Sequence, residues 1–111
     1  MTAARRQDVH RAAARAALDV PGVAALQPGL ADRLAHAAAA SRAHHVSGIR
    51  CNRTPEGGWH VEVRCILHAD TRVVDVARHV REHVRTAVTA CLGTHGAIRP
   101  VDVLVTVTRT V

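Results

Sequence analysis

Residues 72–92 have the sequence RVVDVARHVREHVRTAVTACL, which is the part of the chain that says most about its architecture. Apolar residues recur in it every three or four positions, the spacing that places side chains on one face of an α-helix. The predicted apolar face consists of Val73, Val76, Ala77, Val80, Val84, Ala87, Val88 and Cys91. The stretch therefore predicts an amphipathic helix about 30 Å long, which can cover a strand of about 11 residues from end to end.

A change of period on the N-terminal side of this helix predicts a β-hairpin. Residues 46–53 and 59–69 are strand-like, and the segment TPEGG at 54–58 has the composition of a turn. In the second strand, one face carries Trp59, Val61, Val63, Cys65 and Leu67. We expect the hairpin to pair Arg53 with Trp59, Cys51 with Val61 and Ile49 with Val63.

A third strand is predicted over 101–109, where valines alternate with polar residues and Leu104. Together with the hairpin it gives a three-stranded sheet packed on the long helix. Because the strand over 59–69 has a polar face, it does not resemble a parallel strand that is buried on both sides. Because the helix returns the chain, residues 101–109 should run parallel to residues 59–69. We therefore expect residues 46–53 to lie between these two strands, in a sheet that is antiparallel throughout. The alternative order places residues 59–69 in the centre.

The first 43 residues are dominated by alanine, the best intrinsic helix former. Helices are predicted over 3–18 and 30–43, separated by breaks at Pro21-Gly22 and Pro28-Gly29. These segments have few large apolar residues, so we expect both helices to be lightly attached. The chain, 1–111, is predicted to be a single α+β domain of order α-α-β-β-α-β, with a helical part over 1–43 and a β-β-α-β core over 44–111.

The composition argues against several classes of function. The 111 residues include 15 Arg, no Lys and 9 acids, for a net charge of +6, together with no Phe, no Tyr and one Trp. Such a chain cannot stack successive bases as RNA-recognition sheets and single-strand-binding grooves do. No run of 18 apolar residues is present to cross a membrane, and arginines interrupt residues 1–18, where a signal peptide needs an apolar core. We therefore expect a cytoplasmic protein.

Histidines and cysteines are the candidates for a metal site or a catalytic group. His79 and His83 have the i, i+4 spacing of a helical metal site, but Val80 stands where a zinc-protease helix has glutamate. The chain has three cysteines without CxxC spacing, and we interpret them as buried thiols: Cys51, Cys65 and Cys91. We predict no catalytic, metal-binding or cofactor-binding residues and no enzymatic activity. A metal sensor built from His and Cys is a minor alternative.

Two groups of basic residues are the candidates for partner binding. One group lies on the outer face of the predicted sheet, beside Ile66 and Leu104, unless the alanine-rich helices cover that face. The predicted partner-binding residues are Arg50, His60, Arg64 and His68 on the sheet and Arg78, Arg81 and Arg85 on the long helix. The arginines are dispersed along the chain, which favours a protein partner over nucleic acid. A basic nucleic-acid-binding module built on the β-β-α-β core is the alternative function.

Five segments of the chain resemble a known family. They are residues 16–26 (AALDVPGVAAL), 46–50 (VSGIR), 61–63 (VEV), 73–77 (VVDVA, followed by Val80 and Val84) and 101–107 (VDVLVTV). The Val-Pro-Gly-Val turn and the final strand are the most specific of these. From about residue 9 onward, the chain is similar to the alkaline shock protein 23 family, also called the envelope stress response family.

The resemblance implies a small bacterial cytoplasmic protein without enzymatic activity. Members of this family are associated with cell-envelope stress and homeostasis, and some are held at the membrane by a separate membrane-anchoring partner, where they self-associate. We therefore expect a non-enzymatic interaction or scaffold protein of the stress response that needs no cofactor. It would act through protein–protein contacts near the cell envelope, with a membrane-anchored partner or a homo-oligomer as its assembly.

Overall fold

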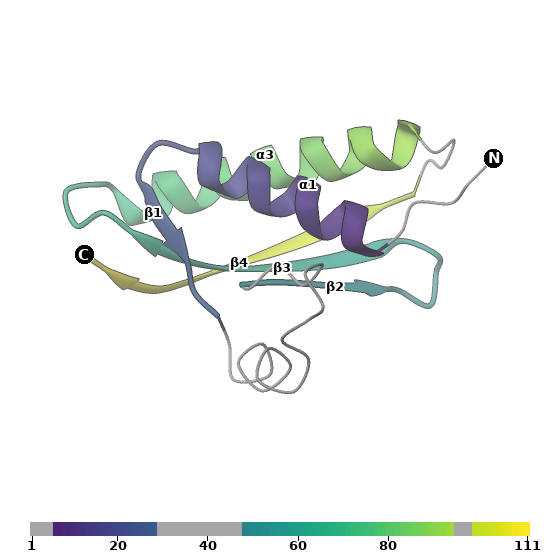
Figure 1. Ribbon diagram of the computed structural model, residues 1–111, viewed down its shortest axis with the longest axis horizontal. Coiled ribbons are helices and arrows are strands. Elements are labelled where there is room, and N and C mark those ends of the chain that lie inside the picture. Colours follow the sequence, from purple (N-terminus) through teal and green to yellow (C-terminus); the bar gives the residue numbers. More distant parts are fainter. Residues whose placement is uncertain (1–5, 29–47, 95–98) are drawn as a thin grey trace.

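Two helices pack on one face of a four-stranded sheet in the part of the chain that the structure describes (Figure 1). The structure is a computed structural model that describes residues 6–28, 48–94 and 99–111. Its elements are α1 (Arg6–Asp19), β1 (Val23–Leu26), β2 (Ile49–Arg53), β3 (Trp59–Leu67), α3 (Val73–Thr94) and β4 (Val101–Thr110). The α+β class predicted from the sequence is confirmed.

Helix α3 confirms the helix predicted over 72–92, but it begins one residue later and ends two residues later. Val73, predicted on its apolar face, is 40% exposed, and Leu92, which was not predicted there, is buried. Its buried side chains are spaced four apart and form one stripe toward the sheet: Val76, Val80, Val84, Val88 and Leu92. Val80, Val84 and Val88 have no exposed surface at all. Burying a valine side chain fully contributes roughly 1.5–2 kcal/mol to folding. The stripe is therefore a main source of the stability of this layer.

The β2–β3 hairpin has the predicted register. Arg53 lies opposite Trp59, Cys51 opposite Val61 and Ile49 opposite Val63. The loop closes because the Thr54 N–H donates to the Gly58 carbonyl over 3.0 Å and the Gly58 N–H donates to Thr54 Oγ1 over 2.9 Å. Gly57 has a φ of +87°, a conformation that residues with a side chain rarely adopt. The TPEGG segment therefore supplies both the hydroxyl and the glycine that the turn requires.

The predicted strand order is wrong, and with it the prediction that all neighbouring strands pair antiparallel; the direction of the last strand is as predicted. β3 is the central strand, as in the alternative order, and β4 runs parallel to it from Trp59 opposite Val101 to Leu67 opposite Thr110. Helix α3 is about as long as β3, so it returns the chain to the start of β3, and the next strand must run in the same direction. β3 offers nine residues for pairing, whereas β2 offers five. Pairing with β3 therefore forms the longer ladder of hydrogen bonds.

Strand β1 was not predicted from the sequence, and it makes the sheet four-stranded rather than three-stranded. Its residues, Val-Ala-Ala-Leu, do not alternate, and only the valine is a residue that favours strands. It pairs antiparallel with the end of β3 that β2 leaves free, with Val23 opposite Leu67 and Leu26 opposite Cys65. The turn before it needs Gly22, because its φ is +99° and a Cβ there would lie 2.8 Å from Val76. The position of β1 follows from tertiary contacts rather than from local preference.

Helix α1 is part of the core, which corrects the prediction that it is lightly attached. Its buried residues are Val9, His10, Ala13, Ala14, Ala16 and Ala17. Because alanine has a short side chain, α1 can approach α3 and the sheet closely. It lies on the same sheet face as α3, so it does not cover the outer face (Figure 1). The second predicted helix, over 30–43, lies outside the described residues.

None of the described helices is long and apolar enough to cross a membrane.

Candidate functional site

The cysteines behave as core residues. Cys51 and Cys65 are buried beneath the helices, and Cys91 is half-buried; none of the three forms a disulfide. Burial raises the pKa of the Cys51 thiol to about 12, against the opposing positive charge of Arg6, and burial also raises the pKa of Cys65. Because the thiolate is the reactive form, neither thiol is suited to act as a nucleophile near neutral pH. Over residues 6–28, 48–94 and 99–111, no group of three His, Cys, Asp or Glu side chains could hold a metal ion.

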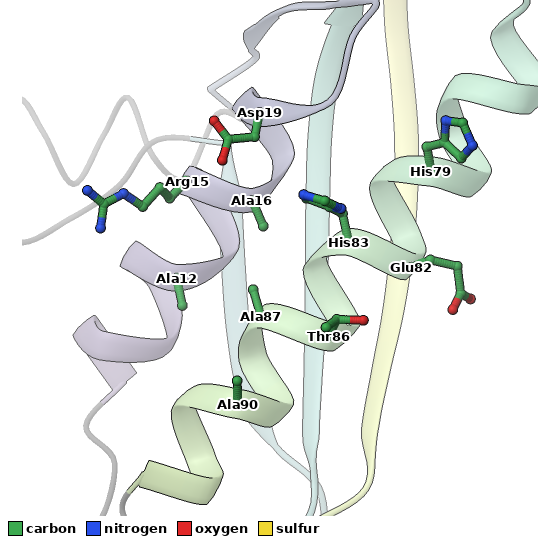
Figure 2. Close-up of a pocket in the computed structure, with 10 residues that line it drawn as sticks. All are labelled: Ala12, Arg15, Ala16, Asp19, His79, Glu82, His83, Thr86, Ala87 and Ala90. Atoms are coloured by element: carbon green, nitrogen blue, oxygen red, sulfur yellow. The ribbon is translucent and has the colours of Figure 1, made fainter.

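A groove of about 520 Å³ runs between α1 and α3 (Figure 2). Its apolar lining is Ala12, Ala16, Ala87 and Ala90, and its polar lining is Arg15, Asp19, His79, Glu82, His83 and Thr86. The His83 ring points across the groove toward α1, whereas the His79 ring points in a different direction (Figure 2). The two histidines therefore do not converge on one metal position. The charges in the lining are of both signs and give no preference for a charged ligand.

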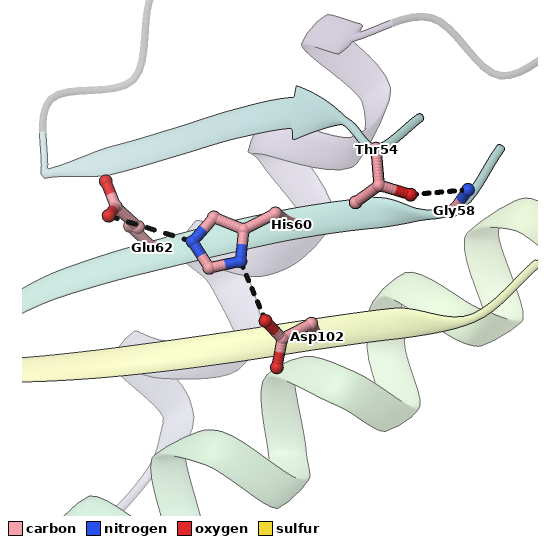
Figure 3. Close-up of polar contacts among 5 residues, drawn as sticks. All are labelled: Thr54, Gly58, His60, Glu62 and Asp102. Atoms are coloured by element: carbon pink, nitrogen blue, oxygen red, sulfur yellow. Dashed lines mark hydrogen bonds and ion pairs between the residues drawn. The ribbon is translucent and has the colours of Figure 1, made fainter. Parts of the chain in front are cut away.

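The outer face of the sheet carries the first predicted group of basic residues, together with two carboxylates. His60 Nδ1 lies 2.9 Å from Asp102 Oδ2, and His60 Nε2 lies 3.7 Å from Glu62 Oε1 (Figure 3). Arg50 lies opposite the same Glu62 across the β2–β3 pair. Sequence reasoning missed the contact with Asp102, because it exists only when β4 pairs with β3. This surface is therefore of mixed charge rather than basic.

The four predicted residues of this face do not form one cluster. Arg50, Arg64 and His68 are exposed, and His60 is partly exposed. Arg50 lies opposite Glu62, whereas His68 follows the end of β3, six residues further on. At about 3.3 Å per residue, that separation is roughly 20 Å. The face brings together His60, Glu62 and Asp102, and it leaves His68 apart.

The second predicted group lies on the helix side of the sheet, at the opposite edge from α1. Helix α1 packs against β1, β2 and β3, whereas α3 packs against α1 and β4. At 100° per residue, Arg78, Arg81 and Arg85 fall on the side of α3 turned away from the α1–α3 groove, above β4. We call these three residues the arginine row.

The arginine row contains more positive charge than its neighbours neutralise. Glu82 Oε1 lies 3.5 Å from Arg85 Nη1 and 4.0 Å from Arg81 Nε. No carboxylate of the described residues lies within ion-pair distance of Arg78. The side chains of Arg81 and Arg85 are 53% and 43% exposed, so an approaching anionic group can reach both. The structure therefore brings the three predicted helix residues together as one basic strip.

Strand β4 presents an open edge beside the arginine row. Across the described part of the chain, β3 is the one strand that pairs with β4. The Pro100 carbonyl accepts a hydrogen bond from the Trp59 N–H, so this carbonyl faces β3. Backbone groups of successive strand residues point alternately to the two sides. The N–H and C=O groups of Val101, Val103, Val105 and Val107 therefore point away from β3, toward the open edge.

Comparison with known proteins assigns the chain to a family. The match extends over residues 4–109 and is to a family model described as having a cell envelope-related function. No curated protein and no solved structure gives a significant match. The matched range includes every helix and strand of the described structure except the last residue of β4. The chain therefore belongs to the alkaline shock protein 23 family, whose function is related to the cell envelope.

Proposed function

We propose that this chain performs its envelope-related role as a non-catalytic adaptor that binds another protein. The observation that carries the proposal is the arginine row above the open edge of β4. A partner at this position would gain backbone hydrogen bonds and opposite-charge contacts at once. We place the chain in the cytoplasm, held near the membrane through its partner. Self-association is the competing form of assembly.

The other two surfaces support such a role less well. The outer sheet face carries two carboxylates, Glu62 and Asp102, beside its arginines, and both carboxylates lie close to His60. The α1–α3 groove is lined by alanines and by charges of both signs. In the arginine row, two of the three cations share one carboxylate, Glu82, and the row therefore favours an acidic partner. Complementary charge of this kind contributes mainly to the rate and specificity of association.

Nucleic acid fits the arginine row less well than protein does. Binding that releases counterions from about three phosphates would give a salt slope of only about −3, which corresponds to weak binding. The open edge of β4 presents peptide groups, which pair best with another peptide backbone. Measurement of RNA and DNA binding against salt tests this alternative. Sub-micromolar affinity with a steep slope would replace the adaptor proposal.

Complementation in cells tests the adaptor proposal. A strain without the gene would receive the wild type, the variant Arg78→Gln/Arg81→Gln/Arg85→Gln, or the control Arg11→Gln/Arg50→Gln/Arg64→Gln. Both variants remove three exposed or partly exposed arginines, so they have the same net charge. We expect the control to restore tolerance of envelope stress and the arginine-row variant to fail. Full tolerance with the arginine-row variant would refute the proposal.

A further inference from the structure

We infer that the open edge of β4 accepts an extended acidic segment of the partner as an additional strand of the sheet, with its carboxylates against the arginine row. The inference rests on the proposed function and gives it a binding mode. It combines two independent features of the described residues: an unpaired strand edge and a basic strip on the helix directly above it.

The edge is long enough and open enough to bind a strand. The outward backbone groups extend from Val101 to Val107, which is about 20 Å. Proteins normally protect such edges with proline, lysine or a bulge. Residues 101–110 contain no proline, and their charged residues are Asp102, on the outer face, and Arg109, where the pairing shifts from Val107 to Arg109 and the ladder is irregular. The protected part of this edge therefore lies beyond Val107. The part from Val101 to Val107 is open and can accept an added strand.

The arginine row fixes the chemistry of the added strand. Side chains on the helix-facing side of that strand would lie below α3, as Val103 of β4 does. Along the helix axis, Arg78 and Arg81 are about 4.5 Å apart, and Arg81 and Arg85 are about 6 Å apart. Alternate residues of a strand are about 6.7 Å apart. Two carboxylates at alternate positions can therefore each meet a guanidinium, which binds carboxylates through paired hydrogen bonds.

One end of the edge adds an apolar contact. The chain enters α3 directly from β3, so the N-terminus of α3 lies near the C-terminal end of the parallel strand β4. Val74 and Val111, both at this end, are 63% and 58% exposed. Val74 falls on the same side of α3 as the arginine row. The partner segment should therefore carry an apolar residue next to its acidic residues.

A second copy of the chain is a poorer occupant of this edge. Pairing two β4 edges about a two-fold axis would place the two arginine rows face to face. Each copy would contribute three arginines and the single neighbouring Glu82. Such juxtaposition of like charges opposes association. An acidic segment of a different protein avoids this repulsion.

Binding of a designed peptide to the full-length chain tests the inference. The probe is a short synthetic peptide with threonine at every second position and either valine or glutamate at the positions between. The control peptide has lysine in place of each glutamate. We expect the acidic peptide to bind and the lysine peptide to bind at least tenfold more weakly. Arg78→Gln/Arg81→Gln/Arg85→Gln should weaken binding of the acidic peptide about tenfold, whereas Arg11→Gln/Arg50→Gln/Arg64→Gln should leave it unchanged.

The strand-like mode of binding is tested by Val105→Pro. Proline removes the N–H that points to the open edge and leaves the hydrogen bonds to β3 intact, which is the setting in which edge strands tolerate it. We expect this variant to lose peptide binding. Because proline can also disturb folding, amide hydrogen exchange of the wild type gives a second measurement. Peptide binding should slow exchange at Val103, Val105 and Val107.

The possible outcomes separate this inference from the proposed function. Peptide binding that neither slows exchange at these valines nor depends on Val105 would refute strand addition. Exchange that slows with protein concentration, without any peptide, would show that a second copy occupies the edge and would overturn the inference. If the arginine-row variant fails in cells but no acidic peptide binds, the adaptor proposal stands and the strand-addition inference falls.

Discussion

Helices α1 and α3 lie on the same face of the sheet but are held there by different side chains. α3 uses a stripe of four valines and a leucine, whereas α1 uses mainly alanines and Val9. α1 covers the half of the sheet formed by β1 and β2, and α3 reaches over β4. The large side chains of α3 stabilise the fold through burial, and the small ones of α1 allow close approach. The side of α3 turned away from α1 is therefore the side that meets an open sheet edge.

At neutral pH, the largest expected effect comes from breaking the valine stripe. Val84→Ala removes two buried carbon atoms and leaves a cavity, so it should lower the free energy of unfolding by about 2–3 kcal/mol. Chemical denaturation measures this change. The matched control is Val74→Ala on the same helix, where the side chain is 63% exposed and the change should be below about 0.5 kcal/mol. Equal effects of the two variants would contradict the assigned stripe.

Overpacking of α1 tests whether this helix is truly part of the core. Ala17 has no exposed surface, so Ala17→Leu should lower the free energy of unfolding by about 1–3 kcal/mol, because its close neighbours cannot make room. Ala12 lines the α1–α3 groove, and Ala12→Leu should be nearly neutral. A lightly attached helix would instead tolerate both changes, and thermal unfolding distinguishes the two cases.

The buried thiol of Cys51 predicts a dependence of stability on alkaline pH. Its pKa is raised from 9.0 to about 12 in the folded chain, so the unfolded chain loses this proton first as the pH rises. The thiol's contribution is therefore fully present below pH 9 and declines between pH 9 and 12, by about 1.4 kcal/mol per pH unit. Cys51→Val should show a shallower decline in denaturation measured over this range. Parallel curves for the two proteins would contradict the burial of this thiol.

The arginine row should contribute least to stability. Arg81 and Arg85 form only exposed ion pairs with Glu82, so Arg78→Gln/Arg81→Gln/Arg85→Gln should change the free energy of unfolding by less than about 0.5 kcal/mol in total. The measurement is urea denaturation at two salt concentrations. A loss of several kcal/mol would mean that these arginines support the fold rather than a partner.

Local patterns were sufficient to predict α3 and the β2–β3 hairpin. The four-residue spacing from Val76 to Leu92 and the alternation from Trp59 to Leu67 each admit one arrangement, and the turn at 54–58 determines the register. These features depend on side chains that are close in the sequence. The structure therefore reproduces the hairpin register and most of the apolar face of α3, and the differences lie at the ends of the elements.

The remaining features depend on contacts between distant segments. β4 pairs with β3 because the return through α3 delivers it there, and this pairing places Asp102 beside His60. The alanines of α1 are buried only because α3 and the sheet surround them. Seven basic residues were predicted to bind a partner. Only the strand order shows that those on the outer sheet face lie among carboxylates and that those on α3 lie beside an open strand edge.

In-cell photo-cross-linking tests the proposed partner surface most directly. A photoreactive amino acid would replace Thr89, which falls on the same side of α3 as the arginine row, or Thr106, which lies on the outer sheet face; both are exposed threonines. We predict an adduct with an acidic segment of an envelope protein from position 89 and none from position 106. An adduct from position 106 alone would contradict the proposal and would assign partner binding to the outer face of the sheet.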